Sequence, residues 1–567
     1  MSARTERYVE RLATAYGIKE YAVLPGGTVV YAAYRDGSYE LCTTDGRLTA
    51  TDGDLTFPQW HAGRGTVLAL RDGGGREQYD LVEADPDTGA VSSLLDDEFR
   101  NTQPRPSPRD DDLLAFVSNR DRSLDLYTLR IGEETVTKRS VTHESVVSHA
   151  WAPDGQRLVY EAGLFEGSAL RVVDLTAGTD EVLVDEPDSE QSLAEGGAWS
   201  AEGIVFTTNH ETGYRELAVG DGNGDYEIRD ADERDKYDAR WAEEDVLFTR
   251  SRGGHRALCR LSDGEVTTVE RSGRNDAAQI HDGTVHYVHR DTGTVGDLYR
   301  DGDPLVREGS VDVLTVAPEE VTYESADGRD VAARLYTPDG DPIGGVVKVH
   351  GGPAAQHFAD LDPVVQSLVR AGFEVIAPDY RGSTGYGRAF RKASDGDVGG
   401  GDLEDVVAAA DYLRDRGRAE VGVVGGSYGG YLSLMGVGAT DAFDAGASAC
   451  GIVDWRTALE NAHGYVGDFF VRKVGGTPEE RPDLYAERSP ITYVDDVDCP
   501  LLVVQGANDP RVPESQAEQL LASLDERGIP CEYVRFEDEG HGVRRTDNRI
   551  EYVTRVVSFF ESALADR

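Results

Sequence analysis

The stretch Val421–Tyr431 reads VGVVGGSYGGY and decides the fold of the second half of the chain. An apolar, β-favouring run leads into GGSYG at residues 425–429, and the helix-like run YLSLMGVG follows. This is the pattern GxSxG at a turn from strand to helix, in which small residues flank a serine on a strained bend. The bend directs the hydroxyl out over the sheet edge, and the helix start supplies N–H groups for an oxyanion. The pattern predicts Ser427 as a nucleophile; the alternative is a Gly-rich turn with a capping serine.

The general base for this serine has two candidates, because His463 and His541 are the histidines that follow it. A serine hydroxyl is a poor nucleophile until a base removes its proton. His541 lies in the Gly-flanked loop FEDEGHGVRRTDN, directly after the strand-like run Cys531–Phe536, whereas no strand-like run precedes His463. We therefore predict His541 as the base, placed over the carboxyl edge of the sheet, and His463 as a surface or pocket-rim residue.

The acid that orients the base should also follow a strand. Asp509 lies four residues beyond the strand-like run Leu501–Gln505, in PLLVVQGANDPRVP. A carboxylate there can accept the Nδ1 proton of His541, which fixes the tautomer and stabilises the imidazolium. The competing acids are Glu514, in the next helical run, and Asp538, beside the histidine. We predict Asp509, which gives the chain order Ser, Asp, His that accompanies GxSxG turns.

An oxyanion in such a site needs two N–H donors. One is the backbone N–H of Tyr428, the residue after the serine. The other is predicted in VVKVHGGPAAQH, where a strand-like run ends at His350 and Gly351 and Gly352 follow. Glycine lets the backbone approach a substrate carbonyl closely. We therefore predict the N–H of Gly352 as the second donor and His350 as a structural residue that holds the turn.

Residues 317–567 alternate between strand-like and helical patterns, which predicts a mostly parallel sheet with helices on both faces. The predicted strands are Val346–His350, Phe373–Ala377, Val421–Val424, Leu501–Gln505 and Cys531–Phe536. The predicted helices are Asp402–Arg416, Pro513–Asp525 and Asn548–Leu564. We take this region as a catalytic domain of the α/β-hydrolase type.

Residues 20–316 have a different texture, with short strand-like runs broken by Asp-Gly turns. A pattern of an aromatic residue or Pro, a polar turn and two β-rich runs recurs in seven copies, for example WAPDGQRLVYEAG from Trp151. The copies lie about 35–50 residues apart, a spacing typical of propeller blades. Blades cannot bury both faces alone and pack into a ring. We predict a seven-bladed β-propeller, with an irregular β-sandwich as the alternative, and a helical segment over residues 1–19 that can dock on the C-terminal half.

The chain of 567 residues is strongly acidic, with 105 Asp and Glu against 57 Lys and Arg and a net charge of −48. This charge repels a phosphate backbone, so we exclude nucleic acid as a partner. Only six of the basic residues are Lys. An acid-rich, Lys-poor composition predicts a protein from an extreme halophile, because brine screens the self-repulsion. The alternative is a merely acidic protein from a low-salt cell.

The five cysteines are scattered without a CxxC pair, which indicates a reducing compartment and neither a disulfide framework nor a zinc site. The stretch Asp221–Asp225 (DGNGD) resembles the start of a calcium loop, but Tyr226 stands where that loop needs Gly. We expect an inter-strand turn there, no metal and no cofactor. No signal-peptide pattern and no long apolar run occur, so we expect a cytoplasmic protein without a membrane span.

Several of these motifs, taken in order, resemble those of the prolyl oligopeptidase family of serine peptidases. They are HGGP at His350–Pro353, DYRGSTGYGR at Asp379–Arg388, GGSYGG at Gly425–Gly430, SPITYVDDVDCPLLVVQGANDPRVP at 489–513 and GH at 540–541. Within the family, the archaeal acylaminoacyl-peptidases are the branch that the chain resembles most. The resemblance implies cleavage of short peptides through an acyl-enzyme, with the propeller excluding folded proteins.

The resemblance also implies substrate-binding residues. Arg511, two places after the acid, corresponds to an arginine that binds substrate in acylaminoacyl-peptidases. Trp455 and Phe469 correspond to apolar pocket residues of that branch. The alternatives are an ordinary loop arginine and plain core packing. Gln505 stands where many members have His, and no confident counterpart of the paired glutamates of dipeptidyl-peptidases is found.

We therefore expect a serine peptidase that acts on short peptides and releases N-acylated amino acids. The same triad also suits a dipeptidyl-peptidase, an oligopeptidase or a carboxylesterase. An alternative of another class is a propeller-based binding protein with a vestigial hydrolase. The preference for the residue before the cleaved bond, exo- or endo-action and assembly into a homo-oligomer stay open.

Overall fold

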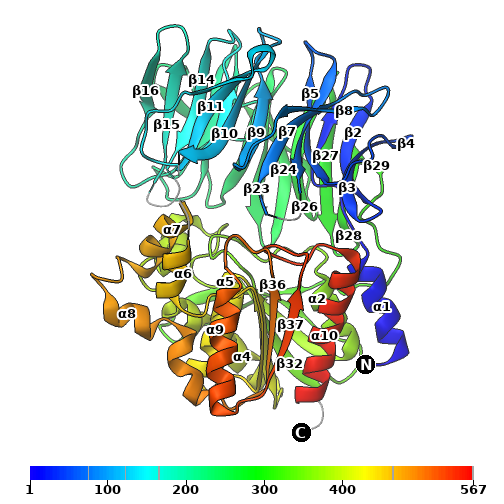
Figure 1. Cartoon of the computed structure of the whole chain (residues 1–567), viewed down its shortest axis with the longest axis vertical. Helices are drawn as coiled ribbons and strands as arrows, with labels where there is room; N and C mark the ends of the chain where they lie inside the picture. Colours follow the sequence, from blue (N-terminus) through cyan, green and yellow to red (C-terminus); the bar gives the residue numbers. More distant parts are fainter. Residues whose placement is uncertain (74–75, 122, 164–166, 463–464, 565–567) are drawn as a thin grey trace.

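The computed structural model describes residues 1–73, 76–121, 123–163, 167–462 and 465–564, and it stacks two bodies on one another (Figure 1). The upper body consists of small antiparallel sheets, coloured blue to green. The lower body is a larger sheet with helices on either side, coloured from green through yellow to red, and the N-terminal helix lies against it. No helix in these ranges is long and apolar enough to cross a membrane.

The upper body contains seven successive groups of antiparallel strands within the described residues. The first four groups are β1 (Tyr21–Val23), β2 (Val29–Arg35), β3 (Ser38–Thr43) and β4 (Gly46–Arg47); β5 (Asp54–His61), β6 (Thr66–Asp72), β7 (Tyr79–Ala84) and β8 (Val91–Leu95); β9 (Asn101–Pro106), β10 (Leu113–Asp121), β11 (Ser123–Arg130) and β12 (Thr135–Lys138); β13 (Val146–Trp151), β14 (Arg157–Ala162), β15 (Ala169–Asp174) and β16 (Thr179–Val184).

The remaining three groups complete the series. They are β17 (Gln191–Ser192), β18 (Trp199–Ser200), β19 (Gly203–Thr208), β20 (Glu216–Gly220) and β21 (Tyr226–Asp230); β22 (Lys236–Ala242), β23 (Asp245–Arg252), β24 (His255–Ser262) and β25 (Glu265–Glu270); β26 (Arg274–His281), β27 (Thr284–Asp291), β28 (Thr294–Arg300) and β29 (Asp303–Val306). A single parallel bridge between Arg256 and Arg274 joins the last two groups into one sheet. The acidic turn at Asp221–Asp225 connects β20 to β21, as predicted.

Local sequence explains the hairpins of these sheets. Asp-Gly pairs at 36–37, 263–264, 282–283 and 301–302 have positive φ at both residues. Two consecutive residues with positive φ form the turn whose twist matches antiparallel strands, and Asp-Gly favours it. The strands between the turns bury apolar side chains on both faces; for example, residues 113–117 at the start of β10 are all apolar and buried. Each group therefore needs a neighbour on either side.

Seven buried apolar clusters in the described residues satisfy that need, and each joins two neighbouring groups of strands. Tyr31 of the first group and Val288 of the last share one cluster, which closes the ring. Around this ring the strand groups are blades, and the upper body is a propeller. The arrangement agrees with the seven predicted copies of the repeat.

The lower sheet has the order β30-β31-β33-β32-β34-β35-β36-β37. Its first three strands pair antiparallel and the rest pair parallel. The strands are β30 (Glu319–Glu324), β31 (Asp330–Tyr336), β32 (Gly344–Val349), β33 (Phe373–Pro378), β34 (Val421–Gly426), β35 (Ala445–Ala449), β36 (Leu501–Gly506) and β37 (Cys531–Phe536). Five match predicted strands. The strands β30, β31 and β35 were not predicted. The sequence of β35 is AGASA, and such small residues have little preference for a β-strand.

Helices cover both faces of this sheet. They are α2 (Pro363–Ala371), α3 (Gly387–Arg391), α4 (Gly401–Asp415), α5 (Tyr428–Ala439), α6 (Trp455–Asn461), α7 (Tyr465–Val474), α8 (Pro482–Glu487), α9 (Ser515–Arg527) and α10 (Thr546–Leu564). Buried residues of α4, α5 and α9 belong to one core cluster, and those of α2 and α10 to another. The sheet therefore lies between two apolar layers.

The N-terminal helix α1 (Ala3–Ala13) packs on this lower body, next to α2 and α10 (Figure 1). Val9 is fully buried in the cluster that α2 and α10 form. Tyr16 donates its hydroxyl proton to the carbonyl of Arg544, and Arg549 donates to the carbonyl of Ala15. The segment before the propeller is thus held against the C-terminal part of the chain.

Candidate active site

The turn between β34 and α5 presents Ser427 in a strained conformation, with φ of +55° and ψ of −122°. Two glycines make this turn possible. A Cβ on Gly425 would lie 2.2 Å from the carbonyl oxygen of Gly429, and a Cβ on Gly429 would lie 2.4 Å from that of Val349. The positions two residues before and two residues after the serine must therefore be glycine, because neighbouring backbone carbonyls leave no room for a Cβ atom.

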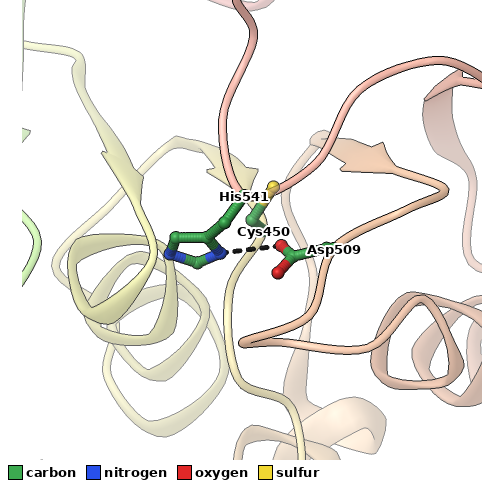
Figure 2. A group of neighbouring side chains, drawn as sticks. All are labelled: Cys450, Asp509 and His541. Atoms are coloured by element: carbon green, nitrogen blue, oxygen red, sulfur yellow. Dashed lines mark hydrogen bonds and ion pairs between the residues drawn. The ribbon is translucent and has the colours of Figure 1, made fainter. Parts of the chain in front are cut away.

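His541 and Asp509 meet Ser427 at the carboxyl edge of the sheet. His541 Nδ1 donates to Asp509 Oδ2 at 2.7 Å, and its Nε2 lies 3.0 Å from Ser427 Oγ. Because an ionised carboxylate only accepts, Nδ1 carries the proton and Nε2 is free to accept from the hydroxyl. Figure 2 shows the imidazole facing the carboxylate. The structure thus brings together the three residues predicted from separate loops.

Asp509 is held in place by its own loop. Its side chain is fully buried, and Oδ1 accepts the backbone N–H groups of Arg511 and Val512 at 2.8 and 3.0 Å. The competing acids have other partners: Glu514 pairs with Arg535, and Asp538 lies 2.9 Å from Arg545. His463 lies outside the described residues.

The predicted oxyanion donors lie on the segments that flank the nucleophile. Tyr428 is the first residue of α5, so its N–H has no acceptor within the helix. The turn after β32 lies against Ser427, because a Cβ on Gly351 would be 3.4 Å from the serine Cβ. Gly352 in this turn has φ of +127°, a conformation that suits glycine. His350 is buried and stacks on Tyr380, so it supports the turn.

Cys450 is a neighbour of the triad that the sequence did not reveal. Its thiol, an oxygen of Asp509 and a nitrogen of His541 lie within 4.8 Å of one another, a grouping that could hold a metal ion (Figure 2). The carboxylate and the imidazole already bind each other. Burial, together with the Asp509 charge, raises the pKa of the Cys450 thiol to about 12. A protonated thiol is a poor metal ligand, so the donor set fits a triad better than a metal site.

Arg511 reaches from the loop of Asp509 to the propeller. Its Nη2 lies 2.8 Å from an oxygen of Glu77, which lies between β6 and β7 and also accepts from Arg100. Burial by itself would raise the pKa of Glu77, but Arg511 and Arg100 together hold it below its ordinary value. About half of the Arg511 side chain stays exposed, so the guanidinium can still offer N–H groups to a substrate. No local signal marks Glu77 among 105 acidic residues.

The two predicted apolar pocket residues lie in different surroundings. Trp455 is completely buried in the core cluster and packs edge to face on Tyr431 and on Phe470. In this structure it is a core residue, and a substrate could touch it only after α6 moved. Phe469 of α7 is partly buried against the same cluster. It therefore keeps some surface that a substrate can contact.

A buried carboxyl group supports the residue that follows the nucleophile. Tyr428 donates its hydroxyl proton to Asp402, which is fully buried at the start of α4. Burial raises the pKa of Asp402 to about 7. The Tyr428 ring is stacked with Tyr380 as well. These contacts fix the residue whose N–H is the predicted first oxyanion donor.

Comparison with known proteins finds peptidase relatives for part of the chain. Residues 359–567 match the model of the prolyl oligopeptidase family. Dipeptidyl aminopeptidase BIII of Pseudoxanthomonas mexicana is 32% identical over 297 residues, which cover 50% of this chain and 43% of that protein. The human acylamino-acid-releasing enzyme is 28% identical over 250 residues, covering 41% and 34%. The matched region is thus less than half the length of either relative.

A solved structure shows the fold over nearly the whole chain. The puromycin-hydrolyzing peptidase of Mycobacterium tuberculosis has a TM-score of 0.87 at 20% identity, and the match covers 99% of this chain and 96% of that one. The propeller and the mixed sheet therefore form a known combination. Over residues 359–567 the chain is similar to the prolyl oligopeptidase family, and its peptidase relatives indicate a serine hydrolase.

Proposed function

We propose that this protein is a serine peptidase that hydrolyses short peptides and releases N-acylated amino acids. The observation that carries the proposal is the continuous hydrogen-bonded chain from Ser427 through His541 to Asp509. The propeller stands over the sheet that bears this chain (Figure 1), which favours short substrates over folded proteins. The similarity to the acylamino-acid-releasing enzyme supports the N-acylated substrate.

The geometry supports a two-step reaction. Ser427 Oγ attacks the peptide carbonyl while its proton passes to His541 Nε2, and Asp509 stabilises the resulting imidazolium. The N–H groups of Tyr428 and Gly352 bind the oxyanion. Nε2 then gives the proton to the leaving amine, and an ester to Ser427 remains. Water repeats the sequence: it gives a proton to Nε2, attacks the ester and frees the acid, and Nε2 returns the proton to Oγ.

Ser427→Ala tests the proposal. On N-acetyl-alanine p-nitroanilide and on p-nitrophenyl butyrate, we expect kcat to fall by at least about 10⁴-fold with the fold retained. The matched control is Ser523→Ala on α9, which lies in the same domain but outside the triad. Retention of more than about one hundredth of the wild-type rate would refute Ser427 as the nucleophile.

A dipeptidyl aminopeptidase is the second candidate, because the relative with 32% identity bears that name. Mass spectrometry of the products of two tetrapeptides, with a free and with an acetylated amino terminus, separates the candidates. Release of an N-acetyl amino acid supports the proposal, whereas release of a dipeptide from the free form alone supports the alternative. A carboxylesterase would hydrolyse the ester and neither peptide.

We also propose that the protein works in the cytoplasm of a halophile, because its net charge of −48 needs screening. Dialysis from molar KCl to low salt should abolish activity. Full activity at low salt would remove the support for this origin. Whether copies of the chain assemble can be measured in the same buffers by light scattering.

A further inference from the structure

A cavity of about 820 Å³ lies in the middle of the molecule. All seven blades contribute to its wall, as do residues 15–17, 19 and 20 of the N-terminal segment. Val543, Arg544 and Arg549 from the lower body complete the lining. Val543 and Arg544 follow His541 by two and three residues, so the loop that carries the base also forms part of the cavity. A chain segment of three residues spans at most about 10 Å, which puts this wall within reach of a bound short peptide.

The charge of this cavity is opposite to that of the protein. Seven cationic and five acidic residues line it, in a chain with a net charge of −48. Burial, together with repulsion from Glu195, raises the pKa of Glu20 to about 7, and burial raises the pKa of Glu161 and of Glu195. Three of the five acids thus keep their protons to a higher pH than a free carboxyl group does. The interior is positive where the remaining surface is negative.

Four of the cations have no carboxylate partner within 4.0 Å among the described residues. They are Lys19, Arg240, Arg544 and Arg549. Lys19 lies over the ring of Tyr39 and Arg549 over that of Tyr16. Arg544 is exposed to the cavity and the solvent beyond it.

Arg240 of β22 is the cation whose surroundings point to a ligand most directly. It is half-buried in the cavity wall, and its Nε is buried without a hydrogen-bond acceptor. A buried N–H of a guanidinium without an acceptor is costly. A carboxylate or a phosphate matches the planar fork of an arginine, and of these two groups a peptide carries the carboxylate. An anion that entered the cavity would therefore satisfy a group that the protein leaves unsatisfied.

Two other cavity arginines show what a satisfied pair looks like here, because Arg274 and Arg290 both bind Asp276. Arg105 donates from Nη2 to the carbonyl of Glu195, but its Nε, like that of Arg240, is buried without an acceptor. The protein thus has acids available at this depth and pairs some arginines with them. Arg240 and Arg544 lack such a partner although the chain has nearly twice as many acids as bases.

We propose that the cavity binds the free C-terminal carboxylate of the short peptide that Ser427 cleaves, through Arg240 and Arg544. This inference rests on the proposed peptidase function and adds the substrate class: peptides with a free carboxyl end. The unpaired guanidiniums hold the carboxylate end while the scissile bond lies at the triad. An ammonium group in the same place would meet more positive than negative charge.

The test compares three matched N-acetylated tetrapeptides in molar KCl. The first has a free C-terminal carboxylate, the second a C-terminal carboxamide, and the third a carboxamide after a final Glu. We expect kcat/KM of the first to exceed that of the second by at least about tenfold, since a hydrogen-bonded charged group typically has that effect. In Arg240→Gln and in Arg544→Gln the ratio should fall to about two or less.

Arg229→Gln is the matched control, because Arg229 on β21 is exposed and binds Glu227 outside the cavity. In this variant the ratio of kcat/KM for the first peptide to that for the second should equal the ratio in the wild type. Arg544→Gln covers the case in which Arg240→Gln fails to fold, since Arg544 is exposed and its side chain has no carboxylate partner among the described residues. Circular dichroism reports on folding in each variant.

The outcomes separate this inference from the proposed function. Equal rates for the first and second peptides overturn the carboxylate anchor and leave the peptidase intact. Recovery of the rate by the final Glu in the third peptide overturns the assignment to the C terminus, since a side-chain carboxylate then serves equally. Hydrolysis of p-nitrophenyl butyrate without cleavage of any peptide overturns both. A ratio unchanged by both cavity substitutions also overturns the inference.

Discussion

Replacement of Asp509 by Asn isolates one step of the reaction. The side chain keeps its size, and its carbonyl oxygen can still accept the N–H groups of Arg511 and Val512, as Oδ1 does now. The position of Oδ2, 2.7 Å from His541 Nδ1, is then occupied by an amide NH₂, which donates. Nδ1 must become the acceptor, and the proton moves to Nε2. The base then points an N–H at Ser427 and cannot take the hydroxyl proton.

The magnitude follows from this exchange of donor and acceptor. The wrong tautomer lowers kcat by about 10⁴-fold in sites of this kind, or about 5 kcal/mol in activation free energy. The free energy of unfolding should change by no more than about 2 kcal/mol, because the two backbone hydrogen bonds remain. The expected signature is a nearly inactive protein with an almost unchanged denaturation curve.

The assay is kcat on N-acetyl-alanine p-nitroanilide, with chemical denaturation measured in parallel. Asp538→Asn is the control: this acid is also near His541 in sequence, but it pairs with Arg545. We expect its kcat to stay within about twofold of the wild type. A loss of less than tenfold in Asp509→Asn, or an equal loss in Asp538→Asn, would show that Asp509 does not orient the base.

Three further predictions concern the contacts around the site. Trp455→Ala should lower the free energy of unfolding by about 3–5 kcal/mol, because the side chain is fully buried; a change in kcat/KM with stability unaffected would instead indicate a pocket role. Glu77→Gln should lower the free energy of unfolding by about 1.5–3 kcal/mol. In a double-mutant cycle, Glu77→Gln and Arg511→Gln should have non-additive effects on kcat/KM, and strictly additive effects would count against the ion pair. The pKa of Glu20 is raised from 4.5 to about 7, so the protonated form is favoured on folding. The contribution of Glu20 to the free energy of unfolding is therefore full below pH 4.5 and is lost as pH rises to 7. The difference between the free energies of unfolding of the wild type and Glu20→Gln, measured against pH, should show this loss.

Local patterns were sufficient for the elements that carry the chemistry. Five consecutive residues were enough to predict the nucleophile turn, because the bend needs glycine at 425 and 429 to avoid clashes with carbonyl oxygens. His541 and Asp509 could be found because each follows a strand, and parallel strands end at one edge. The Asp-Gly hairpins likewise reveal the blades, since two positive φ angles leave few choices of residue.

Contacts between distant segments could not be found in this way. Glu77 and Arg511 are far apart in the chain, and their pairing depends on how the propeller sits on the sheet. Trp455 looks the same in sequence whether it lines a pocket or fills a core; its burial depends on α5 and α7 packing over it. The strand β35 was missed because alanine and glycine have little preference of their own and take their conformation from neighbouring strands.

The sequence by itself determined the two fold types, the order of the triad and the acidity of the surface, because short-range sterics and the alternation of apolar residues set these features. Only the tertiary structure decided which charges meet. The positive cavity draws its lining from every blade and from the loop of His541, so no window of sequence contains it. Electrostatic surroundings depend on distances through space, and those are known only once the ring has closed over the sheet.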